Sequence, residues 1–443
     1  MKKDLLLFFF VFLSALLPAQ TWSSLGKGMN GQVLSLTAYD SVLYVGGQFD
    51  SADLKPMRNI AQWKGSGWSN MGIGINGNVT ALAMYKGSLY AAGQFDSAGG
   101  TYALNIARWN GTSWTAVGNG VNGKVNCLCI YNNTLYAGGS FDSAGGVYAY
   151  NIASWNGTNW DSLSAGISNT VYALAVYNNK LYAGGVFIHA GYVAATYIAS
   201  WNNISWSAVD NGVNNYVYAL DTYQGNLYAG GTFNIAGSNV SVNNLAEWNG
   251  TTWADVGGGM NSYINVIGNY NGGLFAGGGF TLAGSAIVSN IAVWNRVSWD
   301  SLGAGVDSWV NAFTTYGGNL IVGGDFNIAG RDSINYIAQW NGPSLGVNEI
   351  SSLDTKVVVY PNPSNGIFNL SIKNYVPIAI GIGITNRVEV YNVLGVEVYS
   401  HSQITTSSNF QINLSSQPAG IYLYRVITEE GNLISEGKIV ISK

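Results

Sequence analysis

The sequence predicts an all-β protein in which seven short sheets form a ring and a smaller all-β module follows. Three observations support this fold class: tryptophan recurs about every 46 residues, the intervening segments are short β-rich runs broken by glycine, and the repeat starts one strand early. The composition agrees, with 59 glycines, 13% aromatic and only 9% charged residues among 443. Glycine in such numbers is typical of many tight turns, and so low a charge content is not typical of disorder.

Two series of tryptophans define the repeat, and the two series are out of phase with each other. Both advance by 46 residues with a single step of 47. Trp22 has no first-series partner before it, and Trp340 has no second-series partner after it. In a ring, the strand at Trp22 would pair beside Trp340 and remove a free sheet edge. The first series is Trp63, Trp109, Trp155, Trp201, Trp248, Trp294 and Trp340, and the second is Trp22, Trp68, Trp114, Trp160, Trp206, Trp253 and Trp299.

The second repeat shows what each unit encodes. Residues 79–85 form a small, largely apolar run that suits a buried inner strand, and residues 89–95 form a second strand with a glycine that permits close backbone approach. Residues 105–109 and 113–117 form a third and a fourth strand around Asn110-Gly111, the strongest short hairpin signal.

Four antiparallel strands per repeat are typical of a β-propeller blade, in which small residues crowd near the axis and aromatic residues fill the widening outer wedge. We therefore predict a seven-bladed β-propeller over residues 20–342, with the N-terminal strand closing the last blade. A helical repeat is disfavoured because the β-rich runs are short and broken by glycine. A β-solenoid, the remaining alternative, would not explain the offset of the two tryptophan series.

A hydrophobic run, a glycine pair and a downstream tryptophan recur, and this pattern resembles kelch-type propeller repeats. The resemblance implies the same propeller fold, although these repeats are shorter than the roughly 50 residues of kelch repeats. The second repeat departs from the pattern with Ala92-Gly93. The glycine pairs are Gly46-Gly47, Gly138-Gly139, Gly184-Gly185, Gly230-Gly231, Gly277-Gly278 and Gly323-Gly324.

The N-terminus reads as an export signal. Lys2 and Lys3 precede an apolar run over residues 5–17, and Ala19 offers a small residue at a cleavage site, so residues 1–19 are predicted to be a signal peptide. The run is shorter than the roughly 20 residues that a membrane-spanning helix needs. We expect no membrane span after cleavage.

The recurring glycine pairs stop after Trp340, and the C-terminal segment begins after a linker predicted at residues 343–353. It contains YPNP at residues 360–363, VYNVLG at 390–395, GIYLYRV at 420–426 and GKIVISK at 437–443. Alternating strands and turns alone indicate a compact all-β module. The motifs, in this order, resemble the type A C-terminal sorting domain of the type IX secretion system over residues 354–443. The residues that match its motifs are Tyr360, Pro361, Asn362, Pro363, Gly366, Gly395, Gly420, Tyr422, Gly437 and Lys438.

That resemblance implies a small β-sandwich that directs cargo across the outer membrane of a Gram-negative bacterium. It makes the type IX secretion machinery the expected partner. It further implies removal of the tail, followed by release or by attachment to surface lipopolysaccharide. The expected location is therefore secreted or on the outer-membrane surface.

The residue inventory offers little for catalysis or for metal binding. The two histidines, His189 and His401, belong to a loop and to the tail, and the two cysteines, Cys127 and Cys129, share one face of a predicted strand as small core residues. We therefore predict no catalytic residue, no metal and no cofactor. The net charge of −4 without a basic run disfavours nucleic acid, which needs clustered Lys and Arg.

One face of the ring is the candidate binding surface. The loops that enter the inner strands and the loops of the recurring Phe-Asp-Ser-Ala motif are expected to share it, with aromatic residues following some of the entry loops. A flat aromatic ring flanked by amides suits a glycan, and a ring of carboxylates would suit calcium or a sugar. The alternative is that the aspartates only accept backbone hydrogen bonds in tight loops and the aromatics only pack. The candidates are Asn214, Tyr216, Tyr263 and Trp309, with Asp50, Asp96 and Asp142 from the motif loops; Tyr218 belongs to the same group of aromatics.

These observations favour a secreted or surface-exposed, non-catalytic binding or adhesion module whose ligand is a glycan or another surface macromolecule. Two alternatives stay open, namely a polysaccharide-active enzyme and a structural component of a surface layer. Convergent carboxylates on one face would favour the enzyme, and regular self-assembly without a soluble ligand would favour the structural component. A fold alone does not decide between them.

Overall fold

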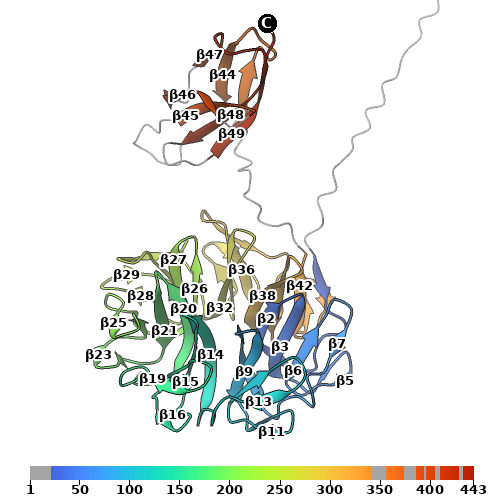
Figure 1. Cartoon of the computed structure of the whole chain (residues 1–443), viewed down its shortest axis with the longest axis vertical. Coiled ribbons are helices and arrows are strands. Elements are labelled where there is room, and N and C mark those ends of the chain that lie inside the picture. The colour runs from blue at the N-terminus through green and yellow to red at the C-terminus, as the bar shows by residue number, and fades with distance from the viewer. Residues whose placement is uncertain (1–20, 342–355, 374–385, 394–395, 405–409, 429–432) are drawn as a thin grey trace, which may run out of the picture. The chain divides into compact units, whose positions relative to one another are not determined.

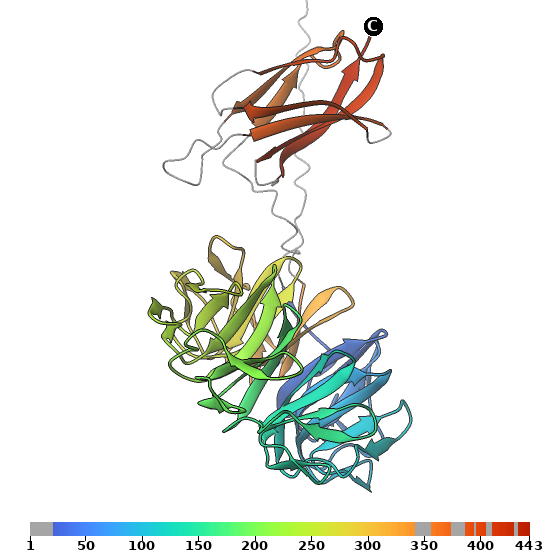
Figure 2. The same ribbon diagram turned by 60° about the vertical axis from the view of Figure 1, so that its left-hand side comes forward.

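The structure is a computed structural model, and it describes residues 21–341, 356–373, 386–393, 396–404, 410–428 and 433–443. Within these residues all regular structure is β, and the chain divides into two compact units, residues 1–345 and 346–443. Figures 1 and 2 show the short sheets of the first unit and the two sheets of the second. The predicted signal peptide (1–19) and linker (343–353) lie outside the described residues.

The described part of the first unit contains seven four-stranded antiparallel sheets, here numbered by their order along the chain. Sheet 1 comprises β2 (Gln32–Tyr39), β3 (Val42–Gln48), β6 (Ile60–Trp63) and β7 (Trp68–Ser69). Sheet 2 comprises β8 (Asn78–Tyr85), β9 (Ser88–Gln94), β12 (Ile106–Trp109) and β13 (Trp114–Ala116). Sheet 3 comprises β14 (Lys124–Tyr131), β15 (Thr134–Ser140), β18 (Ile152–Trp155) and β19 (Trp160–Ser162). Sheet 4 comprises β20 (Val171–Tyr177), β21 (Lys180–Gly185), β24 (Ile198–Trp201) and β25 (Trp206–Ala208).

The remaining three sheets have the same strand order. Sheet 5 comprises β26 (Val217–Tyr223), β27 (Asn226–Gly231), β30 (Leu245–Trp248) and β31 (Trp253–Asp255). Sheet 6 comprises β32 (Ile264–Tyr270), β33 (Gly273–Gly278), β36 (Ile291–Trp294) and β37 (Trp299–Ser301). Sheet 7 comprises β38 (Val310–Tyr316), β39 (Asn319–Gly324), β42 (Ile337–Trp340) and, from the N-terminus, β1 (Trp22–Ser24).

A short two-stranded ribbon interrupts each repeat between its second and third strands. The ribbons contain the Phe-Asp-Ser-Ala segments or their equivalents, because each first ribbon strand begins where that motif's serine lies. They are β4 (Ser51–Ala52) with β5 (Lys55–Pro56), β10 (Ser97–Ala98) with β11 (Thr101–Tyr102), β16 (Ser143–Ala144) with β17 (Val147–Tyr148), β22 (His189–Ala190) with β23 (Val193–Ala194), β28 (Ile235–Ala236) with β29 (Val240–Ser241), β34 (Leu282–Ala283) with β35 (Ala286–Ile287), and β40 (Ile328–Ala329) with β41 (Asp332–Ser333).

The N-terminal strand completes the last sheet, as predicted. Strand β1 pairs antiparallel with β42, and Trp22 lies opposite Trp340. Sheet 7 in turn contacts sheet 1, since the Tyr316 hydroxyl donates to the Ser41 carbonyl at 3.3 Å and β38 lies beside β2 (Figure 1). The first and last sheets of the repeat are therefore neighbours although the chain between them spans the whole unit.

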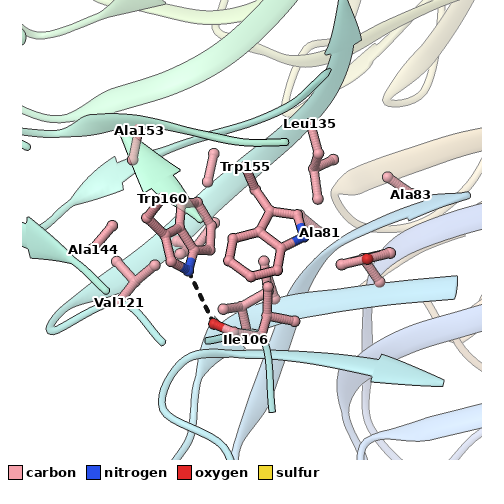
Figure 3. Packing of buried hydrophobic residues seen from close by; sticks show 14 of the residues in the cluster. Ala81, Ala83, Ile106, Val121, Leu135, Ala144, Ala153, Trp155 and Trp160 are labelled. Atoms are coloured by element: carbon pink, nitrogen blue, oxygen red, sulfur yellow. Dashed lines mark hydrogen bonds between the residues drawn. The ribbon is translucent and has the colours of Figure 1, made fainter. Parts of the chain in front are cut away.

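Six of the seven fourth-strand tryptophans donate an indole hydrogen bond to the preceding sheet, and Trp253 of sheet 5 is the exception among them. The indole N–H of Trp160 donates to the Val117 carbonyl at 2.9 Å (Figure 3). The same bond recurs between sheets 7 and 6, where Trp22 donates to Leu302 at 3.1 Å. Trp160 also packs against Trp155 of the third strand, with ring centroids 5.3 Å apart. These rings fill the wide outer part of the wedge between sheets, where the small residues of an inner strand would leave a void.

The recurring glycine pair has a packing explanation. A Cβ at Gly138, the first glycine of its pair, would approach Val171 of the next inner strand to 2.7 Å. A Cβ at Gly139, the second, would approach the Lys124 carbonyl oxygen to 2.1 Å. The second strand of sheet 3 can therefore lie this close to its own inner strand and to the inner strand of sheet 4 because neither glycine has a side chain; sheet 2 has one methyl group, that of Ala92, at the first position. This close approach explains why the glycine pair recurs along the chain.

The second unit has two antiparallel sheets in its described residues. One contains β43 (Lys356–Tyr360), β44 (Ile367–Lys373) and β47 (Phe410–Asn413), and the other contains β46 (Glu397–Ile404), β45 (Asn386–Asn392), β48 (Gly420–Thr428) and β49 (Leu433–Ile441). Phe368 and Ile412 from the first sheet share one buried core with Val390, Tyr422 and Ile439 from the second. Two sheets that pack across one core form a small β-sandwich.

Several residues of the tail motifs have definite structural roles. The Asn362 side chain binds the last strand twice, donating to the Lys438 carbonyl and accepting from the Val440 N–H, both at 2.8 Å. Gly366 has a φ of 110° that favours glycine. Gly437 pairs opposite Tyr424, whose ring would lie 2.7 Å from a Cβ. Gly395 lies outside the described residues.

Candidate functional site

The two predicted sets of loops do share one face, because an entry-loop side chain joins them in every sheet. In sheet 1, the Asn30 side-chain oxygen accepts the backbone N–H groups of Asp50 and Ser51 at 2.8 and 2.9 Å. In sheet 5, Asn214 does the same for Asn234 and Ile235 at 2.9 and 3.0 Å. The amide oxygen of Asn214 is thus engaged within the protein. The equivalent residues elsewhere are Asn76, Asn122, Ser168, Asn261 and Asp307.

The three motif aspartates belong to three different sheets and do not form a joint site. Asp50, Asp96 and Asp142 are all exposed. The expectation that they accept the backbone bonds of their own tight loops needs correction, since the entry-loop side chain accepts those bonds. Asp96 instead accepts the side-chain amide of Asn76 at 2.5 Å, and Asn234 accepts that of Asn214 in the same way in sheet 5.

The predicted aromatic residues come together along one arc of this face. Tyr216 precedes the inner strand of sheet 5, and its ring centroid lies 5.7 Å from that of Tyr197 and 6.2 Å from that of Tyr218. Tyr218 in turn lies 5.2 Å from Tyr172 of sheet 4. Farther along, Tyr263 and Trp309 meet edge to face at 5.6 Å. We call Tyr172, Tyr197, Tyr216, Tyr218, Tyr263 and Trp309 the aromatic arc.

A β-bulge explains why an inner strand can present two aromatics to the arc. In sheet 5, Val217 pairs with Gly231 and Ala219 with Gly230, so Tyr218 is the extra residue of the bulge. A bulge bends the strand locally and redirects its side chain. The same shift occurs in each inner strand, and it places Tyr172 and Asn265 at the corresponding position.

A missing side chain makes room for Tyr263 and Trp309. At the end of the second strand sheet 6 has Gly279, where a Cβ would meet the Tyr263 hydroxyl at 2.6 Å and the Trp309 indole nitrogen at 3.1 Å. The other six sheets have larger residues there. These are Gln48, Gln94, Ser140, Val186, Thr232 and Asp325.

Next to the arc lies a polar cluster that the sequence analysis missed. Asp325 accepts the side-chain amides of Asn311 at 2.8 Å and of Gln32 at 3.0 Å, which links sheets 7 and 1. Burial raises the pKa of Asp325, against the effect of the hydrogen bond from Asn311. Burial and then the nearby Asp325 and Tyr218 raise the pKa of Tyr263. Its position in the repeat, aligned with Gly279 and Thr232, was the signal that could have revealed Asp325.

This arrangement suits recognition of an uncharged, hydroxyl-rich ligand. Tyr216 and Trp309 are 41% and 50% exposed and present aromatic surface, while Asp325 and the neighbouring amides offer hydrogen-bond acceptors and donors. Among the described residues, no group of three or more His, Cys, Asp and Glu side chains is placed to hold a metal ion. His189 is exposed in β22, and His401 of the second unit stacks on Phe410 with centroids 4.5 Å apart.

Comparison with known proteins bears mainly on the second unit. Residues 358–442 match the family described as the secretion system C-terminal sorting domain. No curated protein matches the chain. Among solved structures, the chain is similar to Pyrococcus horikoshii acylaminoacyl peptidase (uncomplexed), with 10% identity and a TM-score of 0.39 over 80% of this chain. The match spans 59% of that structure, and so low a score supports no argument about fold or activity.

No helix long and apolar enough to cross a membrane occurs in the described part of the chain. The family match identifies the export route of the protein, and it covers the motif residues that stabilise the sandwich. Residues 358–442 are a C-terminal sorting domain for export by the type IX secretion system, and the protein is secreted or displayed at the cell surface.

Proposed function

We propose that residues 20–342 form a closed, seven-bladed propeller of kelch-like repeats that acts after export as a non-catalytic binding or adhesion module for a glycan. The fold proposal is supported by the pairing of β1 with β42 and by the tryptophan bonds between successive sheets. The single observation that supports the binding role is the aromatic arc beside Asp325. It lies on the face to which all seven entry loops contribute.

The physical argument rests on how a sugar presents itself. A pyranose ring has an apolar C–H face that packs on an aromatic ring, and its rim of hydroxyls needs both donors and acceptors. Tyr216 and Trp309 offer exposed rings, and Asp325, Asn311 and Gln32 offer the polar groups within the same surface. Pockets that combine aromatic walls with a few fixed polar groups are typical ligand sites.

The distribution of carboxylates supports a non-catalytic role. Glycoside hydrolysis commonly uses two carboxyl groups roughly 5–10 Å apart. Asp325 is the carboxylate bonded to amides beside the arc, whereas Asp50, Asp96 and Asp142 belong to the separate sheets 1, 2 and 3. Asp307, the carboxylate of the sheet 7 entry loop, accepts the backbone N–H groups of Asn327 and Ile328. We infer from this distribution that these groups do not act as an acid and a base around one bond.

The test is a glycan-array screen with the full chain, followed by titration calorimetry on the best ligand. Trp309→Ala and Tyr216→Ala should each weaken binding about tenfold, which corresponds to about 1.4 kcal/mol. Gly279→Gln should also weaken binding because its side chain would displace the two rings above it. Tyr39→Ala is the matched control, since Tyr39 is also 50% exposed but ends β2 at the opposite end of the inner strand.

Three outcomes would contradict the proposal. If no glycan binds, the ligand class is wrong. Release of shortened saccharides would instead identify a polysaccharide-active enzyme. Ordered self-assembly without any soluble ligand would favour a structural surface-layer component.

A further inference from the structure

An open groove of about 380 Å³ lies between sheets 2 and 3, on the same face as the aromatic arc. Asn76, Gln94 and Asp96 of sheet 2 form one wall, and Asn122 and Lys124 of sheet 3 form the other. The groove is polar, in contrast to the arc. None of the proposed arc residues lines it.

At three of the corresponding positions between other sheets, the protein's own side chains occupy the space. Between sheets 4 and 5, Tyr197 and Tyr216 stand where the groove has Asn105 and Lys124, and their rings pack together at 5.7 Å. The equivalence of Tyr197 and Asn105 is structural, because both have a φ near 60° and their carbonyls accept the N–H groups of the equivalent glycines Gly185 and Gly93.

Two further positions are closed in different ways. Between sheets 6 and 7, Tyr263 and Trp309 pack over Gly279. Between sheets 7 and 1, the bond from Gln32 to Asp325 spans the two walls. The groove between sheets 2 and 3 therefore has the general form of the repeat but lacks a side chain that fills it.

Lys124 gives this groove a charge that the equivalent positions lack. The other six residues at this point of the repeat are Gln32, Asn78, Thr170, Tyr216, Tyr263 and Trp309. Lys124 is exposed, and among the described residues the ion pairs involve only Glu389 of the second unit. Within the described residues, its ammonium group therefore forms no ion pair with a carboxylate.

The two ribbons that begin next to the groove's lining residues each carry an exposed tyrosine. Tyr102 pairs with Ser97, next to Asp96, and is 67% exposed. Tyr148 pairs with Ser143, whose N–H is bound by the groove residue Asn122, and is 78% exposed. Large aromatic rings left this exposed offer stacking surface to a ligand longer than one sugar.

We propose that this groove is a second subsite that binds an acidic sugar residue of the glycan. Lys124 pairs with the carboxylate of a uronic acid, while Gln94 and Asp96 bind its hydroxyl groups. The lining carries one cation, Lys124, and one carboxylate, Asp96, on opposite walls, so the ligand's carboxylate is placed on the Lys124 side and its hydroxyls donate to Asp96. This inference deepens the proposed function and rests on it, since it assigns the class of glycan.

The experiment compares two matched probes on the full chain: a galacturonate oligosaccharide and the same oligosaccharide with its carboxyl groups methyl-esterified. Calorimetry should show at least fivefold tighter binding of the acidic form, and this preference should shrink as sodium chloride is added. Lys124→Met should remove the preference, whereas Lys124→Arg should retain it. Lys180→Met is the control, because Lys180 is also exposed but begins β21 at the opposite end of its sheet.

The results separate this inference from the function on which it rests. Equal affinity for the two probes, or a preference that survives Lys124→Met, would overturn the subsite even if glycans bind through the arc. Loss of the preference with Lys180→Met as well would show a general charge effect and would overturn it too. If no glycan on the array binds, both the subsite and the proposed function fail.

Discussion

Removing the indole of Trp22 tests whether the N-terminal strand closes the ring. The side chain is 5% exposed, its ring centroid lies 5.0 Å from that of Trp340, and its N–H donates to the Leu302 carbonyl at 3.1 Å. Trp22→Ala would therefore open a cavity between sheets 7 and 6 and leave a buried carbonyl without that donor. The strand that closes the ring would keep its backbone pairing but lose its main packing group.

The size of the effect follows from these contacts. Replacing a buried Trp by Ala typically costs about 3–5 kcal/mol. The Leu302 carbonyl still accepts the Gly305 N–H at 3.0 Å, so the lost indole bond adds only about 0.5–1.5 kcal/mol. Because the two costs are not additive, we expect Trp22→Ala to lower the free energy of unfolding of the first unit by about 3–5 kcal/mol, mostly through the cavity.

Urea unfolding and calorimetry of the full chain would measure this loss. Trp206→Ala is the matched control, because Trp206 occupies the same place within sheet 4, is 4% exposed and donates to the Leu163 carbonyl at 3.2 Å. The two variants should lose similar stability if closure at the termini is as tight as packing within the chain. A loss below about 1 kcal/mol for Trp22→Ala beside a full loss for Trp206→Ala would refute the closure.

Three further predictions concern other parts of the chain. Asn30→Ala should cost about 0.5–1.5 kcal/mol, because two exposed backbone N–H groups exchange their acceptor for water, and hydrogen exchange should speed up at those amides. Burial alone would raise the pKa of Glu389, but hydrogen bonds from neighbouring tyrosine and arginine side chains lower it overall. The ionised Glu389 therefore stabilises the fold above its unfolded pKa, and this stabilisation is lost as the pH falls through the folded pKa. Glu389→Gln should therefore shrink the difference between the sorting domain's melting temperatures at pH 7 and pH 3, as calorimetry would show. Burial raises the pKa of Cys127, and that of Cys129 to about 12, so iodoacetamide at pH 8 should label both half-buried thiols more slowly before unfolding than after it, by mass spectrometry.

The sequence alone was sufficient for the repeat, the strand order and the sorting domain. The tryptophan series and the glycine pairs are periodic because every wedge between two sheets must be filled in the same way. The same packing constraint therefore recurs in each of the seven repeats of the sequence. The offset of Trp22 and Trp340 predicted the pairing of β1 with β42 for the same reason. The tail motifs were equally informative, since Asn362 and Gly437 occupy positions where other side chains would lose a bond or clash.

Only the tertiary structure decided which of the candidate residues lie together. Tyr216, Tyr263 and Trp309 occupy equivalent places in different repeats, and only the positions of neighbouring sheets show that they form an arc while Asp50, Asp96 and Asp142 do not. The sequence did not reveal Asp325 because its partner Gln32 is far from it in the chain and meets it only where sheets 7 and 1 pack together. Local periodicity determines the shape of each sheet, but a binding site arises where the repeats differ and where distant segments meet, and those contacts exist only once the sheets are packed.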